Sequence, residues 1–194
     1  MMNAFPGGKG RSYPHLINLM PPHKVYIEPY LGGGAVVRNK RPSEVTIVSD
    51  LDSDLVNRTV ADLVLVEGFC TDAIELLRAQ TLSLDTLVYC DPPYLQSTRR
   101  KTKVYRFEYT QDQHIELLEF LVQQQCMVMI SGYDNPLYNE FLKDWNKTQF
   151  NAQTQMGPRT ETVWLNYSFP RKLHDSRYWG NDFRERQNRK RRQQ

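Results

Sequence analysis

Hydrophobic residues along the chain form two kinds of pattern: short apolar runs, and longer stretches in which apolar positions recur. The short runs are rich in β-branched residues and predict buried strands. They cover residues 24–28, 44–50, 68–72, 86–90 and 127–131, of which 68–72 predicts only a short strand and turn. Two later runs predict a final pair of strands at residues 145–152 and 160–165, separated by a turn at residues 156–158.

Between these runs, apolar side chains return at every third or fourth position, which predicts helices. The predicted helices cover residues 35–38, 51–66, 73–80, 111–124 and 136–144. Strands that alternate with helices indicate an α/β fold, a mostly parallel sheet with helices on both faces. Residues 182–192 are charged and have no apolar stripe. The pattern therefore predicts one domain over residues 1–170, followed by a tail over residues 171–194.

Composition narrows the class of protein. The chain is 40% hydrophobic and 24% charged, which is typical of a soluble domain, and it has no apolar run long enough for a transmembrane helix. The first residues lack the apolar segment of a secretory signal, so a cytoplasmic protein without membrane contact is expected. Cys70, Cys90 and Cys126 lie in apolar runs without metal-binding spacing. They are interpreted as reduced core thiols, and no metal site is expected.

Charge is distributed unevenly between the predicted domain and the tail. Residues 171–194 contain nine Lys or Arg and three Asp or Glu, a net charge of +6, whereas the whole chain carries only +3. The other residues therefore carry −3. A basic tail on a slightly acidic body indicates a nucleic-acid partner, with Arg189 and Arg191 as candidate phosphate contacts. The alternative is a tail that only increases solubility.

The most informative stretch is the strand at residues 86–90 and the residues Asp91, Pro92, Pro93 and Tyr94 that follow it. The two prolines end the strand, because they lack backbone N–H groups and fix φ near roughly −65°. Asp91 and Tyr94 then project from the carboxyl end of the strand, where ligands bind in open α/β sheets. The alternative is an ordinary strand end with a Pro-Pro turn.

An acid and two prolines at this position suit methylation of a base amine. The exocyclic amine of a base is a poor nucleophile because its lone pair is delocalised into the ring. The Asp91 carboxylate and the Pro92 carbonyl can accept both N–H bonds and localise that lone pair on nitrogen. Pro93 restricts Pro92 to the extended conformation that this role needs. Tyr94 can stack on a base taken out of its helix.

Glycine-rich stretches mark a second candidate site. Residues 5–10 combine glycines with Phe5 and Lys9, although a mobile terminus would look the same. Residues 29–34 form a glycine turn between a strand and a helix, an arrangement that can hold a nucleotide-like ligand. Asp50 ends the next strand about twenty residues later, where such folds bind a ribose; it could instead cap the following helix. Asp72 is predicted to cap a helix, with contact to a cofactor adenine as the alternative.

Residues 95–110 form a polar stretch in which basic and aromatic side chains alternate, a composition that suits phosphate contacts and base stacking. The alternative is a solvated loop. Because the stretch follows Asp91 directly, it is interpreted as substrate-binding, through Ser97, Thr98, Arg99, Arg100, Lys101, Lys103 and Arg106.

With these motifs in this order, residues 4–168 resemble the Dam-type DNA adenine N6-methyltransferases, and most of all the compact members found in phages and prophages. The similarity extends to Ser131-Gly132-Tyr133 and to Arg159-Thr160-Glu161. The resemblance implies a seven-stranded Rossmann-like sheet with one late antiparallel strand, and S-adenosylmethionine as methyl donor. It implies the activity of a site-specific adenine DNA-methyltransferase, EC 2.1.1.72. It also implies donor contacts at Phe5, Lys9, Glu28, Pro29, Gly32, Gly34, Asp50, Cys70 and Asp91.

The chain departs from the family in one respect. Dam-type enzymes carry a helical target-recognition insertion before the catalytic strand, and only about twenty residues separate Cys70 from Asp91 here. Weak or very short sequence specificity is therefore expected.

Other functions are alternatives to DNA methylation. N6-methylation of adenine in RNA is the closest alternative, and a non-catalytic nucleic-acid-binding protein is the next. Protein glutamine methylation ranks last, because it usually goes with Asn in place of Asp91. A cytosine C5 mechanism is rejected because Cys90 lies within the strand. The sequence leaves the oligomeric state and the biological role open.

Overall fold

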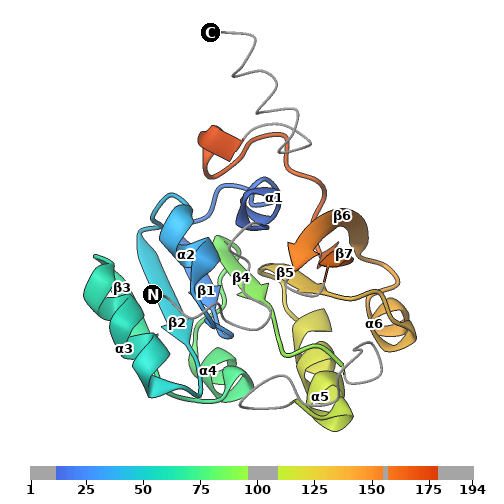
Figure 1. The fold of residues 1–194 in the computed structure, drawn as a ribbon, viewed down its shortest axis with the longest axis horizontal. Coiled ribbons are helices and arrows are strands. Elements are labelled where there is room, and N and C mark those ends of the chain that lie inside the picture. The colour runs from blue at the N-terminus through green and yellow to red at the C-terminus, as the bar shows by residue number, and fades with distance from the viewer. Residues whose placement is uncertain (1–11, 96–108, 155–156, 179–194) are drawn as a thin grey trace, which may run out of the picture.

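The computed structural model describes residues 12–95, 109–154 and 157–178. Within these residues, seven strands form one sheet in the order β3-β2-β1-β4-β5-β7-β6 (Figure 1). Their bounds are β1 Val25–Glu28, β2 Val45–Ser49, β3 Val66–Phe69, β4 Thr86–Cys90, β5 Met127–Gly132, β6 Asn146–Thr154 and β7 Gly157–Leu165. Strands β1 to β5 pair in parallel, whereas β7 is antiparallel to both β5 and β6. The α/β class and the late antiparallel strand are thereby confirmed.

Helices cover both faces of this sheet. Consecutive strand residues point to opposite sides, and in this sheet both sets include buried apolar side chains, so each face needs a covering layer. On one face, Tyr26 and Leu87 pack with apolar residues of α1 (Tyr13–Ile17), α2 (Ala35–Asn39) and α3 (Ser53–Asp62). On the other, Ile27 and Val88 pack with α4 (Ala73–Ala79), α5 (Gln111–Val122) and α6 (Pro136–Phe141). The sequence did not predict α1, which is only five residues long.

Two helix ends show how short polar side chains set the boundaries. The helix predicted over residues 51–66 is shorter at both ends, because Asp52 caps α3 by accepting a hydrogen bond from the Asp54 N–H. At its other end the chain turns through Leu65, which has φ of 61°, into β3. Asp72 caps α4 by accepting from the Ile74 and Glu75 N–H groups, which confirms its predicted capping role.

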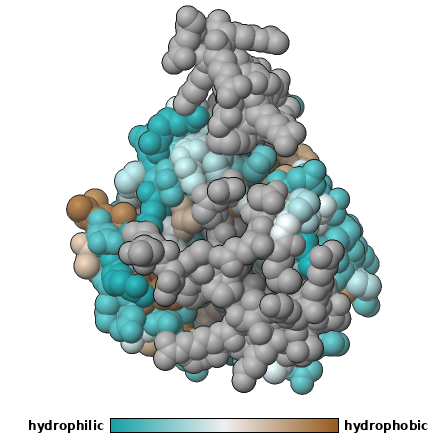
Figure 2. Space-filling view, viewed as in Figure 1, coloured by the Kyte–Doolittle hydropathy of each residue, from teal (hydrophilic) through white to brown (hydrophobic). Residues whose placement is uncertain are grey.

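Strand β3 is the edge strand next to α3, and this corner exposes apolar side chains. Val64 and Leu65 are 84% and 73% exposed, and Figure 2 shows hydrophobic surface over α3 and β3 at the left margin. The helix nevertheless lies tightly on the strand. A Cβ built at Gly68 would lie 2.5 Å from Val60 Cγ2 and 2.6 Å from Val56 Cγ1, so the close contact requires glycine.

Residues 173–178, which we call the C-terminal clasp, fold back onto α1 and onto the loop after α2. Leu173 and Asp175 are buried, and Ser176–Tyr178 form a short 3-10 helix, η2. The His174 ring stacks on His23 with 3.9 Å between ring centroids. The packed body therefore continues to Tyr178, beyond the boundary predicted at residue 170. The remaining tail lies outside the described residues.

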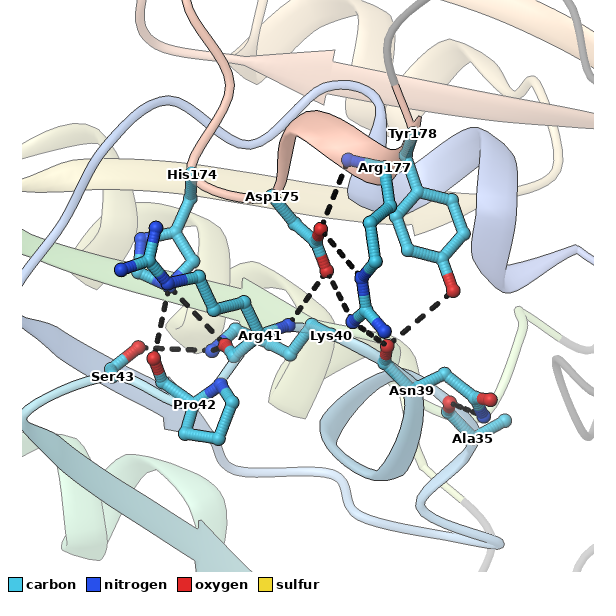
Figure 3. Close-up of polar contacts among 10 residues, drawn as sticks. All are labelled: Ala35, Asn39, Lys40, Arg41, Pro42, Ser43, His174, Asp175, Arg177 and Tyr178. Carbon is cyan, nitrogen blue, oxygen red and sulfur yellow. Dashed lines mark hydrogen bonds and ion pairs between the residues drawn. The ribbon is translucent and has the colours of Figure 1, made fainter. Parts of the chain in front are cut away.

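Asp175 is the polar centre of the clasp. Figure 3 shows its carboxylate between the Arg177 guanidinium and the backbone of Arg41, which donates a hydrogen bond at 2.8 Å. Burial raises the pKa of Asp175, but the hydrogen bonds from Arg177 and Arg41 outweigh it and hold the pKa below its ordinary value. The charged carboxylate is therefore the form that stabilises the fold.

Asp175→Ala should lower the free energy of unfolding by about 1–3 kcal/mol, because it leaves the Arg41 N–H without its acceptor. Most of the effect should come from this bond, since the Arg177 side chain is 67% exposed and such an ion pair contributes little. A depressed native pKa stabilises the fold above the unfolded pKa of about 3.9. The difference from wild type in urea unfolding should therefore be largest near pH 7 and shrink below pH ~4. Exposed Asp144→Ala is the control, and an equal loss in both variants would contradict the prediction.

No helix within the described residues is long and apolar enough to cross a membrane.

Candidate active site

The predicted motifs meet at one edge of the sheet. Strands β1, β2 and β4 are parallel neighbours, so their carboxyl ends lie at the same edge. Residues 29–34 follow β1, Asp50 follows β2 and Asp91 follows β4. Three segments separated by tens of residues in the sequence are thereby placed side by side.

Asp91 is held from the neighbouring strand. Ser131, in β5, donates a hydrogen bond from its hydroxyl to Asp91 Oδ1 at 2.8 Å. The Ser131 oxygen lies 3.0 Å from the Tyr89 hydroxyl, and because the Ser131 proton is directed at Asp91, Tyr89 is the donor in that contact. Burial raises the pKa of Tyr89 well above its ordinary value, which keeps this donor protonated. The hydrogen bonds from Tyr89 to Ser131 and from Ser131 to Asp91 orient one carboxylate oxygen of Asp91. Asp91 itself is only partly buried.

Tyr94 lies beyond the two prolines with its ring almost buried. Only 6% of the residue is exposed, and its hydroxyl donates to Glu161 Oε2 at 2.7 Å. The ring of Tyr133 meets it edge-on, with 4.4 Å between ring centroids. Because so little of the residue is exposed, stacking of a base on Tyr94 stays a prediction.

The glycine turn after β1 is braced by Asp50. Gly32 donates its N–H to Asp50 Oδ2 at 2.9 Å, and the other carboxylate oxygen accepts from the Asp52 N–H. Gly32 and Gly34 have φ of 49° and 63°, in the left-handed region that favours glycine. Because Asp52 is the cap of α3, Asp50 is not its N-cap. Its predicted ribose contact stays a prediction.

Glu28 ends β1 and is buried with 3% of its surface exposed. Burial raises its pKa to about 8, a hydrogen bond from the Tyr26 hydroxyl opposes this shift, and the nearby Asp91 carboxylate adds to it. Lys40 lies with its Nζ 4.2 Å from the centre of the Tyr26 ring. Burial lowers the pKa of Lys40 to about 8, and attraction to Glu28 opposes that shift. Burial therefore favours the neutral form of Glu28, which lies next to Pro29 and the glycine turn.

Cys70 was predicted to be a core thiol, and that prediction is wrong. It is exposed, whereas Cys90 and Cys126 are buried as predicted. Cys70 follows β3, an edge strand whose residues are mostly exposed, and its Sγ lies 3.6 Å from the Leu51 carbonyl oxygen. Leu51 and Phe69 are also exposed large apolar residues, and the Asp50 N–H donates to the Phe69 carbonyl. Leu51, Phe69 and Cys70 are thus accessible beside Asp50. Cys70 was already among the predicted donor contacts, whereas Leu51 and Phe69 were not predicted.

Several predicted site residues lie outside the described part of the chain. They are Phe5 and Lys9 for the donor, and Ser97, Thr98, Arg99, Arg100, Lys101, Lys103, Arg106, Arg189 and Arg191 for nucleic acid. Their roles stay predictions. Among the residues that the structure describes, no group of three or more His, Cys, Asp or Glu side chains is placed to hold a metal ion.

The structure adds Ser131, Tyr133 and Glu161 to the site. The sequence contained a signal for all three, since the stretches Ser131-Gly132-Tyr133 and Arg159-Thr160-Glu161 belong to the family resemblance. Their roles were not visible, because each depends on strand pairing between distant segments. Gly132 pairs with Thr162 in the antiparallel β5–β7 ladder, which places the two stretches next to each other.

Several solved structures with this fold are methyltransferases. An rRNA methylase from Streptococcus thermophilus matches with a TM-score of 0.52 and 13% identity, over 85% of this chain and 98% of that chain. The N-methyltransferase NodS from Bradyrhizobium japonicum WM9 matches with a TM-score of 0.55 and 11% identity, over 83% and 100%. Its complex with S-adenosyl-L-homocysteine matches with a TM-score of 0.50 and 12% identity, over 75% and 79%. These likenesses define the fold as that of methyltransferases. A search of curated proteins found no match.

Sequence comparison is more specific. The family model of the D12 class N6 adenine-specific DNA methyltransferases matches residues 5–63 and 61–156. The chain belongs to this family, which confirms the resemblance to adenine methyltransferases drawn from its motifs.

Proposed function

We propose that this protein transfers the methyl group of S-adenosylmethionine to the N6 amine of adenine in DNA, the activity EC 2.1.1.72. The observation that carries the proposal is the position of Asp91. It lies at the carboxyl end of β4, is oriented by Ser131 and is followed by Pro92, at the sheet edge that also carries the glycine turn. Membership of the adenine-specific family supports the choice of base and amine.

The residues at this edge fit such a donor. A Cβ at Gly34 would lie 3.2 Å from Leu31 Cδ1 and 3.3 Å from Arg38 Nε, and its φ of 63° favours glycine, so glycine allows the shape of the turn over which the methionine part would bind. The accessible apolar surface of Leu51, Phe69 and Cys70 suits the adenine of the donor, and Asp50 beside it suits the ribose hydroxyls. The complex of NodS with S-adenosyl-L-homocysteine shows that this fold accommodates a ligand of that class.

The chain's own groups perform the steps around the target amine. The Asp91 carboxylate and the Pro92 carbonyl each accept a hydrogen bond from one of the two N6–H groups. These hydrogen bonds localise the nitrogen lone pair and aim it in line with the methyl group. When bound, the donor supplies that methyl group on a positively charged sulfur, which keeps the bonding electrons and leaves as a neutral thioether. The methylated nitrogen then releases a proton through its hydrogen bond to Asp91. Positioning and electrostatics account for the acceleration.

Affinity for the polymer would come from phosphate contacts. The basic residues between positions 97 and 106 and those of the tail supply the positive charge for this role. Between β3 and β4 the described chain contains α4 as its only helix, so there is no recognition insertion before the catalytic strand. We therefore propose low sequence specificity, with few base edges read.

Nucleoside analysis tests the proposal. The protein is incubated with S-adenosylmethionine and either unmethylated duplex DNA or RNA, the polymer is digested, and N6-methyladenine is measured by mass spectrometry. We expect N6-methyldeoxyadenosine from DNA and little product from RNA. The reverse preference would establish an RNA methyltransferase. Salt-sensitive DNA binding without donor binding or product would establish a non-catalytic binding protein.

A further inference from the structure

Strand β7 brings an acid to the catalytic tyrosine from 67 residues further along the chain. Glu161 is 4% exposed, and its Oε2 accepts the hydrogen bond from the Tyr94 hydroxyl at 2.7 Å. A buried carboxylate is costly unless hydrogen bonds satisfy it, so its presence beside the site requires a reason. At 2.7 Å, this bond has the usual length of a well-formed hydrogen bond from a hydroxyl.

The same strand supports the ring that packs against Tyr94. Arg159 and Glu161 are two residues apart in β7, so their side chains project from the same side of the strand. The Arg159 guanidinium carbon lies 5.7 Å from the centre of the Tyr133 ring, within cation–π range. Tyr133 in turn meets the Tyr94 ring at an angle of 64°. Glu161 therefore holds the hydroxyl end of Tyr94, while Tyr133, with Arg159 over it, packs against the ring.

We propose that Glu161 is a positioning residue for base binding, which fixes the Tyr94 ring in the orientation needed to stack on the target base. The inference rests on the proposed function. Without the hydrogen bond, the ring must be ordered each time a base enters, and binding loses that preorganisation. Glu161 itself contacts neither the donor nor the reacting nitrogen in this role, because it acts through Tyr94.

A double-mutant cycle tests the inference. We expect Glu161→Gln and Tyr94→Phe each to lower kcat/KM for DNA about 10- to 100-fold, the range for a hydrogen bond to a charged group. Both act on the same bond, so the double variant should be no worse than the more severe single variant. Dissociation constants for S-adenosyl-L-homocysteine, measured by calorimetry, should stay within about 2-fold, because the donor site is untouched. Glu140→Gln, on the exposed side of α6, is the matched control and should be unchanged.

Three outcomes overturn the inference. Wild-type kcat/KM in Glu161→Gln would show that the bond does not position the ring. Losses that multiply in the double variant would show that the two residues act independently. A parallel loss of donor affinity would show a general structural role. Each of these presupposes an active wild-type protein, so a wild-type protein that methylates no nucleic acid would refute the proposed function, and this inference with it.

Discussion

Replacing Asp91 with asparagine should lower methyl transfer to DNA by at least about 100- to 1,000-fold, the scale of losing one preorganised catalytic hydrogen-bond partner. The amide has the same shape but places an N–H donor or a neutral oxygen where a carboxylate accepts from the N6 amine. Without the charged acceptor the nitrogen lone pair stays delocalised. Asp91→Ala removes both carboxylate oxygens and should leave no measurable transfer.

The measurement is the rate at which labelled methyl groups are incorporated into unmethylated duplex DNA with saturating donor. Circular dichroism and thermal unfolding establish that each variant is folded, which is expected because Asp91 lies at a strand end and is only partly buried. Asp144→Asn, an exposed carboxylate after α6, should retain wild-type activity. Near wild-type incorporation by folded Asp91→Ala would refute the proposed mechanism.

The second large effect is expected at Asp50. Asp50→Ala should weaken donor binding about 10- to 100-fold, the range for losing hydrogen bonds to a charged group. The carboxylate already accepts from the Gly32 and Asp52 N–H groups. A carboxylate has about four acceptor positions, so two remain that can accept from the ribose hydroxyls.

Two ligands separate the two contributions of Asp50. S-adenosyl-L-homocysteine has both the ribose and the amino-acid part, whereas 5′-methylthioadenosine lacks the amino-acid part that would lie over the glycine turn. If Asp50 holds the ribose, calorimetry will show weaker binding of both ligands. Weaker binding of S-adenosyl-L-homocysteine alone would reduce Asp50 to a brace for Gly32. Exposed Asp54→Ala is the control and should bind both ligands as wild type does.

The central strands were predictable because each is a short apolar run whose ends are marked locally. By contrast, β3 forms at Val66–Phe69 rather than at residues 68–72, and β7 begins at Gly157, within the predicted turn. Residues 86–90 form a strand over the predicted span, and Pro92 and Pro93 explain why it stops. The helix predicted over residues 51–66 was too long, since apolar periodicity continues past both the Asp52 cap and the turn at Leu65. An apolar run predicts burial correctly only when its strand lies inside the sheet. Cys70 lies in an apolar stretch, but its strand is at the edge of the sheet.

The sequence by itself determined the class of fold and the place of the candidate catalytic acid at a strand end, because a strand, an acid and two prolines are read from neighbouring residues. Only the tertiary structure decided what surrounds that acid. Ser131 reaches Asp91 through the β4–β5 pairing, and Glu161 reaches Tyr94 through the antiparallel β5–β7 pairing. The structure also decided that Asp50 braces Gly32 and that the clasp around Asp175 belongs to the packed body. These contacts join residues 18 to 134 positions apart, and no local pattern of side chains encodes which distant strand or loop will be the neighbour.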